Sequence, residues 1–405
     1  MAHTPDSAAR EPIPLCTPVI GGNAWKYVKD CLDTGWVSSV GSYVERFEQM
    51  TAQRLGAKHA VATSSGTAAL HIALLAAGVQ SGDDVLVSTL TFIATANSVR
   101  YCGARAVPID AEPATWQIDP QLVADFCRDE CRFENGRLIR RSNGRRVSAI
   151  VAADILGHPA DFEALREIAD RYHLALIEDA AESLGASYRG RPAGNLAHIG
   201  CLSFNGNKLI TSGGGGMLVT DRDDWAEHAR RLSTQAKDDP VEFVHSELAY
   251  NYRLSNLQAA LGCAQLEQLD DHLAAKRRIA AAYQFAFETT PGIRFMPSAR
   301  WAHGSCWLST VLVDAERFGI GSRDLIRLLD EHGIQSRPLW EPMHRSAVHR
   351  SGDNPPCPIA DRLYAEAVSL PSSVDLSEVQ IGRVIAAVHE AANLSRTIRD
   401  IVPSV

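Results

Sequence analysis

The 405-residue sequence contains no run of about 20 apolar residues, so we expect no transmembrane helix. It also lacks an excess of basic residues, and its formal net charge of −8 argues against a nucleic-acid partner. Residues 1–14 are polar, are interrupted by prolines and lack the apolar segment of a signal peptide. We therefore expect a flexible leader at 1–14 and a cytoplasmic protein.

Disulfide and metal chemistry also find little support in the sequence. Nine cysteines are scattered along the chain, an odd number that favours reduced thiols over a disulfide framework. Cys127 and Cys131 are four residues apart, but no second pair or histidine cluster accompanies them at ligand spacing. We predict no metal site.

What the sequence does contain is the composition and the periodicity of a globular enzyme. Apolar residues make up 45% and charged residues 22%, and the length suffices for two domains. From about residue 58 to about residue 235, short apolar runs alternate with helical patterns, which indicates an α/β domain. Strands are expected at 60–63, 85–87, 106–109, 149–152 and 174–177, and helices at 93–101, at 160–173 and after a serine cap at Ser64 or Ser65.

Further segments complete the expected organisation. Residues 128–146 are charged and contain two Asn-Gly turn pairs, which predicts an exposed hairpin insertion. Residues 256–288 predict one long helical stretch, and a strand at 307–313 followed by a helix at 324–332 predicts a second, small α/β domain. The predicted boundaries are a large domain at 15–270 and a linking helix with the small C-terminal domain at 271–405.

The most informative residue is Lys208. It follows an apolar run that closes with Asp179, and it precedes four glycines at 213–216. A lysine in an apolar stretch has its ammonium form disfavoured by desolvation, which prepares it to attack a carbonyl. A strand-end carboxylate can hold a pyridine nitrogen protonated, so that the ring acts as an electron sink. Together these residues predict a pyridoxal 5′-phosphate (PLP) enzyme with Lys208 as its Schiff-base lysine; taken alone, Lys208 fits a solvated loop lysine as well.

A second motif fits the same cofactor. Residues 64–70 place small and hydroxyl side chains where a strand turns into a helix, and the free N–H groups of a first helical turn can cradle a phosphate. Gly66 allows close approach of the backbone, and Thr67 adds a hydroxyl. A plain serine cap explains this motif equally well.

Three more side chains are each ambiguous alone but follow in a consistent order. Phe92 lies at a strand end, where it can stack on a flat ring or pack in the core. Glu182 can reach the ring hydroxyl, and Ser203 can donate to the phosphate. The order phosphate turn, aromatic residue, acid, serine, lysine and glycine run is much harder to obtain by chance.

In this order the chain resembles the DegT/DnrJ/EryC1/StrS sugar aminotransferases, which belong to the fold-type I PLP enzymes. The resemblance extends from roughly Ile13 to the C-terminal region. Six blocks carry it: 34–39, 65–71, 91–97, 178–183, 203–208 and 251–260. It implies an aspartate-aminotransferase-like fold, with a large domain around a mostly parallel mixed sheet and a small C-terminal α/β domain.

The resemblance also implies roles by position. Lys208 is matched to the catalytic lysine that binds the cofactor and moves a proton, and Asp179 to the partner of the pyridine nitrogen. The remaining expected cofactor contacts are Gly66, Thr67, Phe92, Glu182, Ser203, Asn205 and, from the partner subunit of a homodimer with shared sites, Asn251. Glu182 departs from the glutamine common in the family, so we expect it to be protonated or paired.

Within the family, the lysine motif, the insertion at 128–146 and the segment 334–340 resemble the LegC subgroup. That resemblance implies transfer of an amino group from glutamate to C4 of a UDP-linked 4-keto-6-deoxy-N-acetylhexosamine. Candidate substrate contacts are Trp36, Ser38, His158, Arg253, Arg337 and His344. Open alternatives are an aminotransferase for another nucleotide keto-sugar, of the GDP-perosamine or dTDP-amino-sugar type, and a PLP-binding regulatory protein without turnover.

Overall fold

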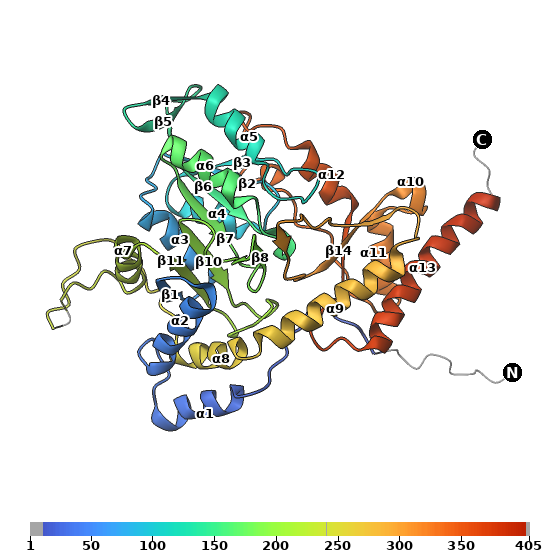
Figure 1. The fold of residues 1–405 in the computed structure, drawn as a ribbon, viewed down its shortest axis with the longest axis horizontal. Coiled ribbons are helices and arrows are strands. Elements are labelled where there is room, and N and C mark those ends of the chain that lie inside the picture. Colours follow the sequence, from blue (N-terminus) through green and yellow to red (C-terminus); the bar gives the residue numbers. More distant parts are fainter. Residues whose placement is uncertain (1–10, 240, 402–405) are drawn as a thin grey trace.

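The computed structural model describes residues 11–239 and 241–401 and shows a large domain built on a nine-stranded sheet (Figure 1). In spatial order its main strands are β1 (His59–Thr63), β11 (Gly216–Thr220), β10 (Ile199–Ser203), β7 (Ala175–Asp179), β6 (Arg146–Ala153), β2 (Asp84–Ser88) and β3 (Arg105–Ile109). The strands from β10 to β3 in this order are parallel to their neighbours, whereas β11 is antiparallel to both β1 and β10. The predicted mixed, mostly parallel α/β sheet is therefore confirmed.

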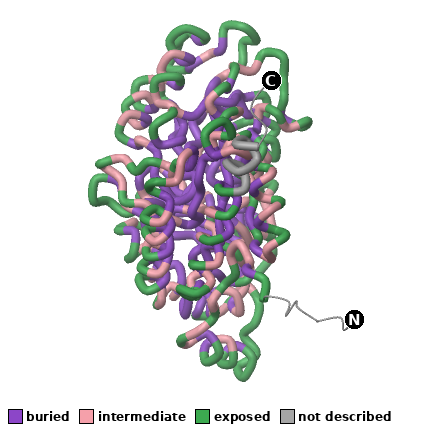
Figure 2. Tube along the Cα trace, turned by 90° about the vertical axis from the view of Figure 1, so that its right-hand side faces the viewer, coloured by how far each residue is buried: buried purple, intermediate pink, exposed green. Residues whose placement is uncertain are grey.

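Helices cover both faces of this sheet, because its strands are apolar on both sides. One face packs on α3 (Gly66–Ala76), α4 (Ala94–Tyr101) and α7 (Asp223–Ser233). The other face packs at one end on α2 (Ser42–Leu55) and α8 (Asn256–Leu266), with α1 (Ala24–Thr34) outside them, and at the other end on α5 (Pro120–Asp125) and α6 (Phe162–Tyr172). Figure 2 shows the buried residues concentrated in the interior of these layers.

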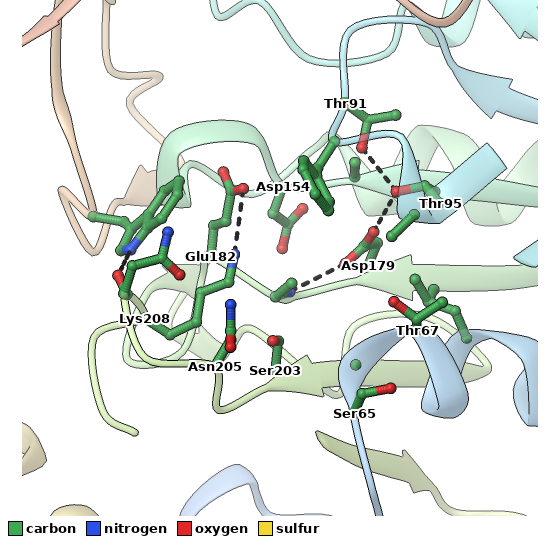
Figure 3. A pocket seen from close by; sticks show the side chains of 18 of the residues that line it. Ser65, Thr67, Thr91, Thr95, Asp154, Asp179, Glu182, Ser203, Asn205 and Lys208 are labelled. Atoms are coloured by element: carbon green, nitrogen blue, oxygen red, sulfur yellow. Dashed lines mark hydrogen bonds and ion pairs between the residues drawn. The ribbon is translucent and has the colours of Figure 1, made fainter. Parts of the chain in front are cut away.

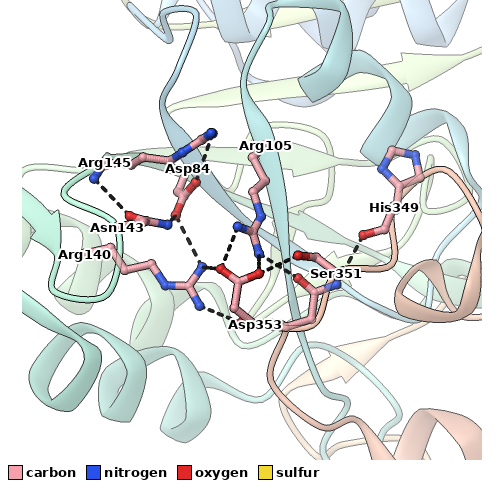
Figure 4. Close-up of polar contacts among 9 residues, drawn as sticks. Asp84, Arg105, Arg140, Asn143, Arg145, His349, Ser351 and Asp353 are labelled. Atoms are coloured by element: carbon pink, nitrogen blue, oxygen red, sulfur yellow. Dashed lines mark hydrogen bonds and ion pairs between the residues drawn. The ribbon is translucent and has the colours of Figure 1, made fainter.

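The charged insertion forms the predicted hairpin from β4 (Cys131–Glu134) and β5 (Arg137–Arg140). Asn135 and Gly136 both have positive φ, as a two-residue turn between twisted strands requires. The insertion is not wholly exposed, however. Arg140 is 3% exposed and forms ion pairs with Asp84 at 3.4 Å and with Asp353 at 3.7 Å, so the hairpin is joined to both β2 and the C-terminal part of the chain (Figure 4).

The helical stretch predicted at 256–288 is two helices, because α8 ends at Leu266 and α9 (Leu269–Phe287) begins after Gln268. Glu267, between them, accepts hydrogen bonds from Asn23, Tyr27 and Arg46. These contacts hold the connection against α1 and α2. α9 then runs out of the large domain to the opposite end of the molecule (Figure 1).

The small domain packs α9, α11 (Ser322–Glu331) and α13 (Glu378–Ile401) on an antiparallel sheet. The predicted strand at 307–313 and helix at 324–332 correspond to β14 and α11. The sheet consists of β12 (Ile293–Phe295), β14 (Ser309–Val313) and β15 (Ala367–Leu370). Two short helices, α10 (Ala315–Phe318) and α12 (Pro358–Glu366), lie between β14 and β15 in the sequence. A separate small sheet contains β8 (Ser187–Tyr188), β9 (Arg191–Pro192) and β13 (Ala302–His303).

The N-terminal segment contributes to this small domain. Residues 1–10 of the predicted leader lie outside the described residues, but Ile13 is fully buried. Its N–H donates to Gly333 at 2.8 Å, and its carbonyl accepts from Gln335 at 2.9 Å. The flexible-leader prediction is therefore wrong at Ile13, because this side chain completes the small-domain core. Among the described helices, none has the length and apolar composition needed to cross a membrane.

Candidate active site

The turn between β1 and α3 offers free backbone N–H groups to an anion. Ser65 caps α3, its Oγ accepting from the N–H of Ala68 at 3.0 Å. A Cβ placed on Gly66 would lie 2.8 Å from the Cβ of Ser203, so only glycine fits beside β10. The free N–H groups and the positive dipole end of α3 thus face the same space as the Ser203 and Thr67 side chains.

Asp179 is the last residue of β7 and is held by two hydrogen bonds. Thr95 Oγ1 donates to its Oδ2 at 2.6 Å, and the N–H of Ala181 donates to its Oδ1 at 3.2 Å. Burial raises the pKa of this carboxyl group, and the two hydrogen bonds and the charge of Lys208 oppose that rise. A carboxyl group held in this way can pair with a protonated pyridine nitrogen, and that pairing would stabilise the charged form of the carboxyl group.

Lys208 points toward Glu182 from the loop between β10 and β11 (Figure 3). Its Nζ lies 3.6 Å from Glu182 Oε1, and the N–H of Leu156 donates to Glu182 Oε2 at 2.7 Å. Burial raises the pKa of Glu182 to about 7, although Lys208 acts in the opposite direction. Glu182 is therefore paired with Lys208, in line with the expectation that it is protonated or paired, and it lies where it can exchange a proton with that amine.

These groups converge on one cavity of about 340 Å³ at the carboxyl ends of β2, β6, β7 and β10. This is the edge at which parallel α/β sheets bind their ligands. Phe92, which is 51% exposed, stands at the cavity and is available to cover a flat ring. The structure brings together these predicted residues: Gly66, Thr67, Phe92, Asp179, Glu182, Ser203, Asn205 and Lys208.

Among the cavity residues without a predicted role, four make notable contacts. Thr95 belongs to the 91–97 block, yet only the structure shows its contact with Asp179. Asp154 is fully buried behind the cavity, where burial and the neighbouring Glu178 raise its pKa. Trp307 and Trp340 stack on each other with ring centres 6.0 Å apart, and Lys208 Nζ lies 4.3 Å from the Trp307 ring. No local pattern signals the two tryptophans, because they reach the cavity from the C-terminal part of the chain.

Two predicted substrate contacts, His158 and His344, have both ring nitrogens in contact with protein groups, and their role in binding substrate stays a prediction. His158 is 2% exposed; its Nδ1 bonds the carbonyl of Pro159 at 2.8 Å, and its Nε2 accepts from Ala299 at 3.1 Å. Burial lowers the pKa of His158, in agreement with a neutral ring. His344 connects Thr89, at 2.7 Å, with Asp361, at 3.2 Å. Both imidazoles are thus occupied by protein groups outside the lining of the cavity.

The other predicted contacts also lie outside the cavity lining of this chain. Arg337 is exposed, and its guanidinium bonds the carbonyl of Ser336. The carbonyls of Trp36 and Ser38 accept from Asn256 at the start of α8. Two further residues are engaged through their main chains, Arg253 with Thr63 and Asn251 with Thr234. The roles predicted for these residues in binding substrate, and for Asn251 in a partner's site, stay predictions.

Comparison with known proteins decides the family. The model of the DegT/DnrJ/EryC1/StrS aminotransferase family matches residues 18–389. The chain belongs to this family. A GDP-perosamine synthase of Caulobacter vibrioides is 38% identical over 93% of this chain and 98% of the relative. EpsN of Bacillus subtilis, described as a pyridoxal phosphate-dependent aminotransferase, is 37% identical over 92% and 93%.

A solved structure gives the same answer for the fold. The structure of DesI, analysed in the presence of its TDP-sugar product, has a TM-score of 0.87 and 28% identity over 97% of this chain and 96% of that one. The chain is thus a PLP-dependent aminotransferase that acts on nucleotide sugars. The LegC subgroup is not singled out by these relatives and stays a prediction.

The cavity fits the cofactor of this family. The phosphate turn at Gly66, the carboxyl group of Asp179 and the amine of Lys208 line one space, so partners for the phosphate, the ring nitrogen and the reactive aldehyde are all available there. Phe92 and the hydroxyls of Thr67 and Ser203 complete the surround. Within the described part of the chain, the structure contains no group of three or more side chains suited to hold a metal ion.

Proposed function

We propose that this enzyme transfers the amino group of glutamate to C4 of a GDP-linked 4-keto-6-deoxyhexose. The observation that carries this proposal is the 38% identity, over almost the full length of both chains, to a relative named GDP-perosamine synthase. GDP-perosamine is a GDP-linked 4-amino sugar, so the matching acceptor is the corresponding 4-keto sugar. This acceptor departs from the UDP-linked N-acetyl sugar that the LegC resemblance implies.

When bound, PLP supplies an electron sink that stabilises negative charge on the carbon from which a proton is taken. Asp179, fixed by Thr95, would support the positive charge on the ring nitrogen. The α3 turn with Ser203 would hold the phosphate, and Phe92 would shield the ring from water. These contacts orient the group without taking part in proton movement.

Lys208 performs the proton movement. Its Nζ accepts the proton from the α-carbon of glutamate in the first half-reaction and delivers a proton to C4 of the sugar in the second. Glu182, 3.6 Å away and with a pKa near 7, can hold or return a proton at Nζ between these steps. The Trp307 ring lies 4.3 Å from Nζ, where its face can contact the amine when Lys208 is not bonded to the cofactor.

The proposed assembly is a homodimer in which Asn251 completes the partner's phosphate site. Asn251 is exposed and does not line the cavity of its own chain, which agrees with a role in trans. This arrangement comes from the family resemblance and is tested below.

A substrate panel tests the acceptor. The purified enzyme is supplied with glutamate and with each of three 4-keto-6-deoxy sugars, carried on GDP, on dTDP, or on UDP with an N-acetyl group. A pocket that hydrogen-bonds one base leaves buried donors unpaired with another, so we expect kcat/KM for the GDP sugar to be larger by roughly 10³-fold. Preference for either other sugar would contradict this acceptor and leave the aminotransferase activity intact. Lys208→Ala enzyme gives the background rate.

A further inference from the structure

One buried lysine has no part in the chemistry above. Lys276, on α9, is 1% exposed, and burial lowers the pKa of its ammonium group. Its Nζ contacts the carbonyl oxygens of Trp307, at 2.9 Å, and of Ser372. A third contact is the sulfur of Cys16, 3.3 Å away.

These contacts place the Lys276 amine directly against a thiol, and the lowered pKa makes its neutral form easier to reach than that of an exposed lysine. A neutral amine has two N–H bonds and one lone pair, and the two carbonyl groups accept both N–H donors. In the structure Nζ also donates to Cys16 Sγ at 3.3 Å, so loss of that proton leaves the lone pair directed at the sulfur. The thiol of Cys16 lies 3.4 Å from the carbonyl oxygen of Asn207, to which it donates, so its proton points away from Lys276.

Cys16 is also open to small reagents. All nine cysteines are free; seven are buried, and Cys16 and Cys306 are partly exposed. A partly exposed thiol beside a basic nitrogen is a preferred target of peroxide. Cys16 therefore combines access from solvent with a nucleophile already in contact.

We propose that hydrogen peroxide joins Cys16 and Lys276 through a covalent sulfur–nitrogen bond. Peroxide first oxidises the thiol by two electrons to a sulfenic acid, and one water is released. The Lys276 amine then attacks this sulfur; the S–O bond breaks, the S–N bond forms, and the departing hydroxide leaves as a second water with one amine proton. The protein thereby loses two hydrogen atoms in total. Two equivalents of an added thiol reverse the bond, restoring Cys16 and Lys276 and forming one disulfide of the reagent.

The cross-link reaches the active site through Asn207, the residue before Lys208. The Asn207 carbonyl accepts from Cys16 Sγ and from Trp307 Nε1, the latter at 2.8 Å. Bonding of the sulfur to Lys276 removes the thiol proton and with it one of these two donors. Since Trp307 also contacts Lys208, the cross-link acts on the segment that positions the catalytic amine.

The test treats the PLP-loaded enzyme with hydrogen peroxide, digests it without reductant and analyses the peptides by mass spectrometry. We expect a peptide pair joining Cys16 to Lys276, two hydrogens lighter than the sum of its parts, which disappears after dithiothreitol. Activity should fall in proportion to the cross-linked fraction and return with the reductant. A sulfinic acid at Cys16 with Lys276 free, a Cys16–Cys306 disulfide, or an unmodified Cys16 would overturn the proposal.

Two variants serve as controls. Cys16→Ser retains a donor for the Asn207 carbonyl but cannot form the bond, so its digest should lack the cross-link and its activity should resist peroxide. Cys306→Ser removes the other partly exposed thiol, and in this variant the Cys16–Lys276 cross-link should form to the same extent as in the original enzyme. Loss of the cross-link in Cys306→Ser, with its circular dichroism unchanged, would count against a direct Cys16–Lys276 reaction.

Discussion

Thr95 Oγ1 donates a 2.6 Å hydrogen bond to Asp179 Oδ2, and the Thr95 hydroxyl in turn lies 2.9 Å from that of Thr91. This chain of hydroxyls fixes the carboxyl group that we propose pairs with the ring nitrogen. It also opposes the effect of burial, which on its own favours the neutral acid.

We predict that Thr95→Val lowers kcat by about 10- to 100-fold, because a hydrogen bond to a charged group contributes roughly 1.5–3 kcal/mol. Thr95→Ser keeps the hydroxyl and should stay within a few fold of the original enzyme. Steady-state kinetics of both variants provide the measurement. Equal rates for the two would show that the hydroxyl does not support Asp179.

Lys208→Ala should abolish transamination, since it removes the group that moves the proton. Borohydride treatment of the loaded enzyme should attach the cofactor to the peptide that contains Lys208, and this attachment should be absent in the variant. Lys58→Ala, at a lysine that is half-exposed and paired with Asp223, is the matched control and should retain both properties. Attachment at another lysine with normal turnover would contradict the assignment.

The elevated pKa of Glu182 predicts a pH dependence of stability in the cofactor-free protein. The carboxyl pKa rises from about 4.5 in the unfolded chain to about 7 in the fold, so the folded state binds more protons between these values. Stability should therefore fall as pH increases from about 5 to about 7, by up to roughly 3 kcal/mol. Glu182→Gln should remove this part of the slope.

Denaturant unfolding of both proteins at a series of pH values tests this prediction. The informative quantity is the difference in the free energy of unfolding between Glu182→Gln and the original protein. A difference that does not change across this pH window would show that the Glu182 carboxyl group titrates normally.

The role of Asn251 in trans predicts complementation. In a mixed dimer of Lys208→Ala and Asn251→Ala subunits, one site keeps its own Lys208 and receives Asn251 from the partner. At equimolar random exchange, about a quarter of the original activity should return, because half of the dimers are mixed and each has one intact site. Demonstrated exchange without recovery would place Asn251 in its own subunit's site or in a structural role.

Arg140 provides a prediction about stability. Its replacement by methionine leaves Asp84, which is fully buried, without its closest cation, and such a loss costs about 3–5 kcal/mol. Arg141→Met changes the neighbouring exposed arginine and should cost less than about 0.5 kcal/mol. Denaturant unfolding of both variants measures the difference; equal values would show that the Asp84 pair contributes little.

The sequence predicts the layered α/β domain well, because alternating apolar runs and helical periods are local properties. It also predicts Asp179 and Lys208, since a strand-end acid and a lysine before a glycine run can be seen within short segments. The paired state of Glu182 is also expected, because an unpaired negative charge there would repel the oxygen of the cofactor's ring hydroxyl.

Residues that depend on tertiary packing escaped prediction. Trp307 and Trp340 enter the cavity only because the C-terminal part of the chain folds against it. His158 and His344 have the residue type of a ligand, but their ring nitrogens are taken by groups distant in the sequence, including Ala299 for His158 and Thr89 for His344. The break between α8 and α9 depends on partners more than 200 residues earlier, among them Tyr27.

The N-terminal segment gives the small domain a covalent connection to the large domain in addition to α9. The chain leaves that domain after Thr17, which contacts Ser373, and meets the large domain at Val19, whose carbonyl accepts from Gln265. α9 forms another crossing, with Leu273 in the large-domain core and Ile279 in the small-domain core. The chain also returns to the large domain where β13 pairs with β8 and where the N–H of Met343 donates to the carbonyl of Thr89 at 2.7 Å. Trp307 and Trp340 therefore reach the cavity on a segment that is anchored to the large domain on both sides.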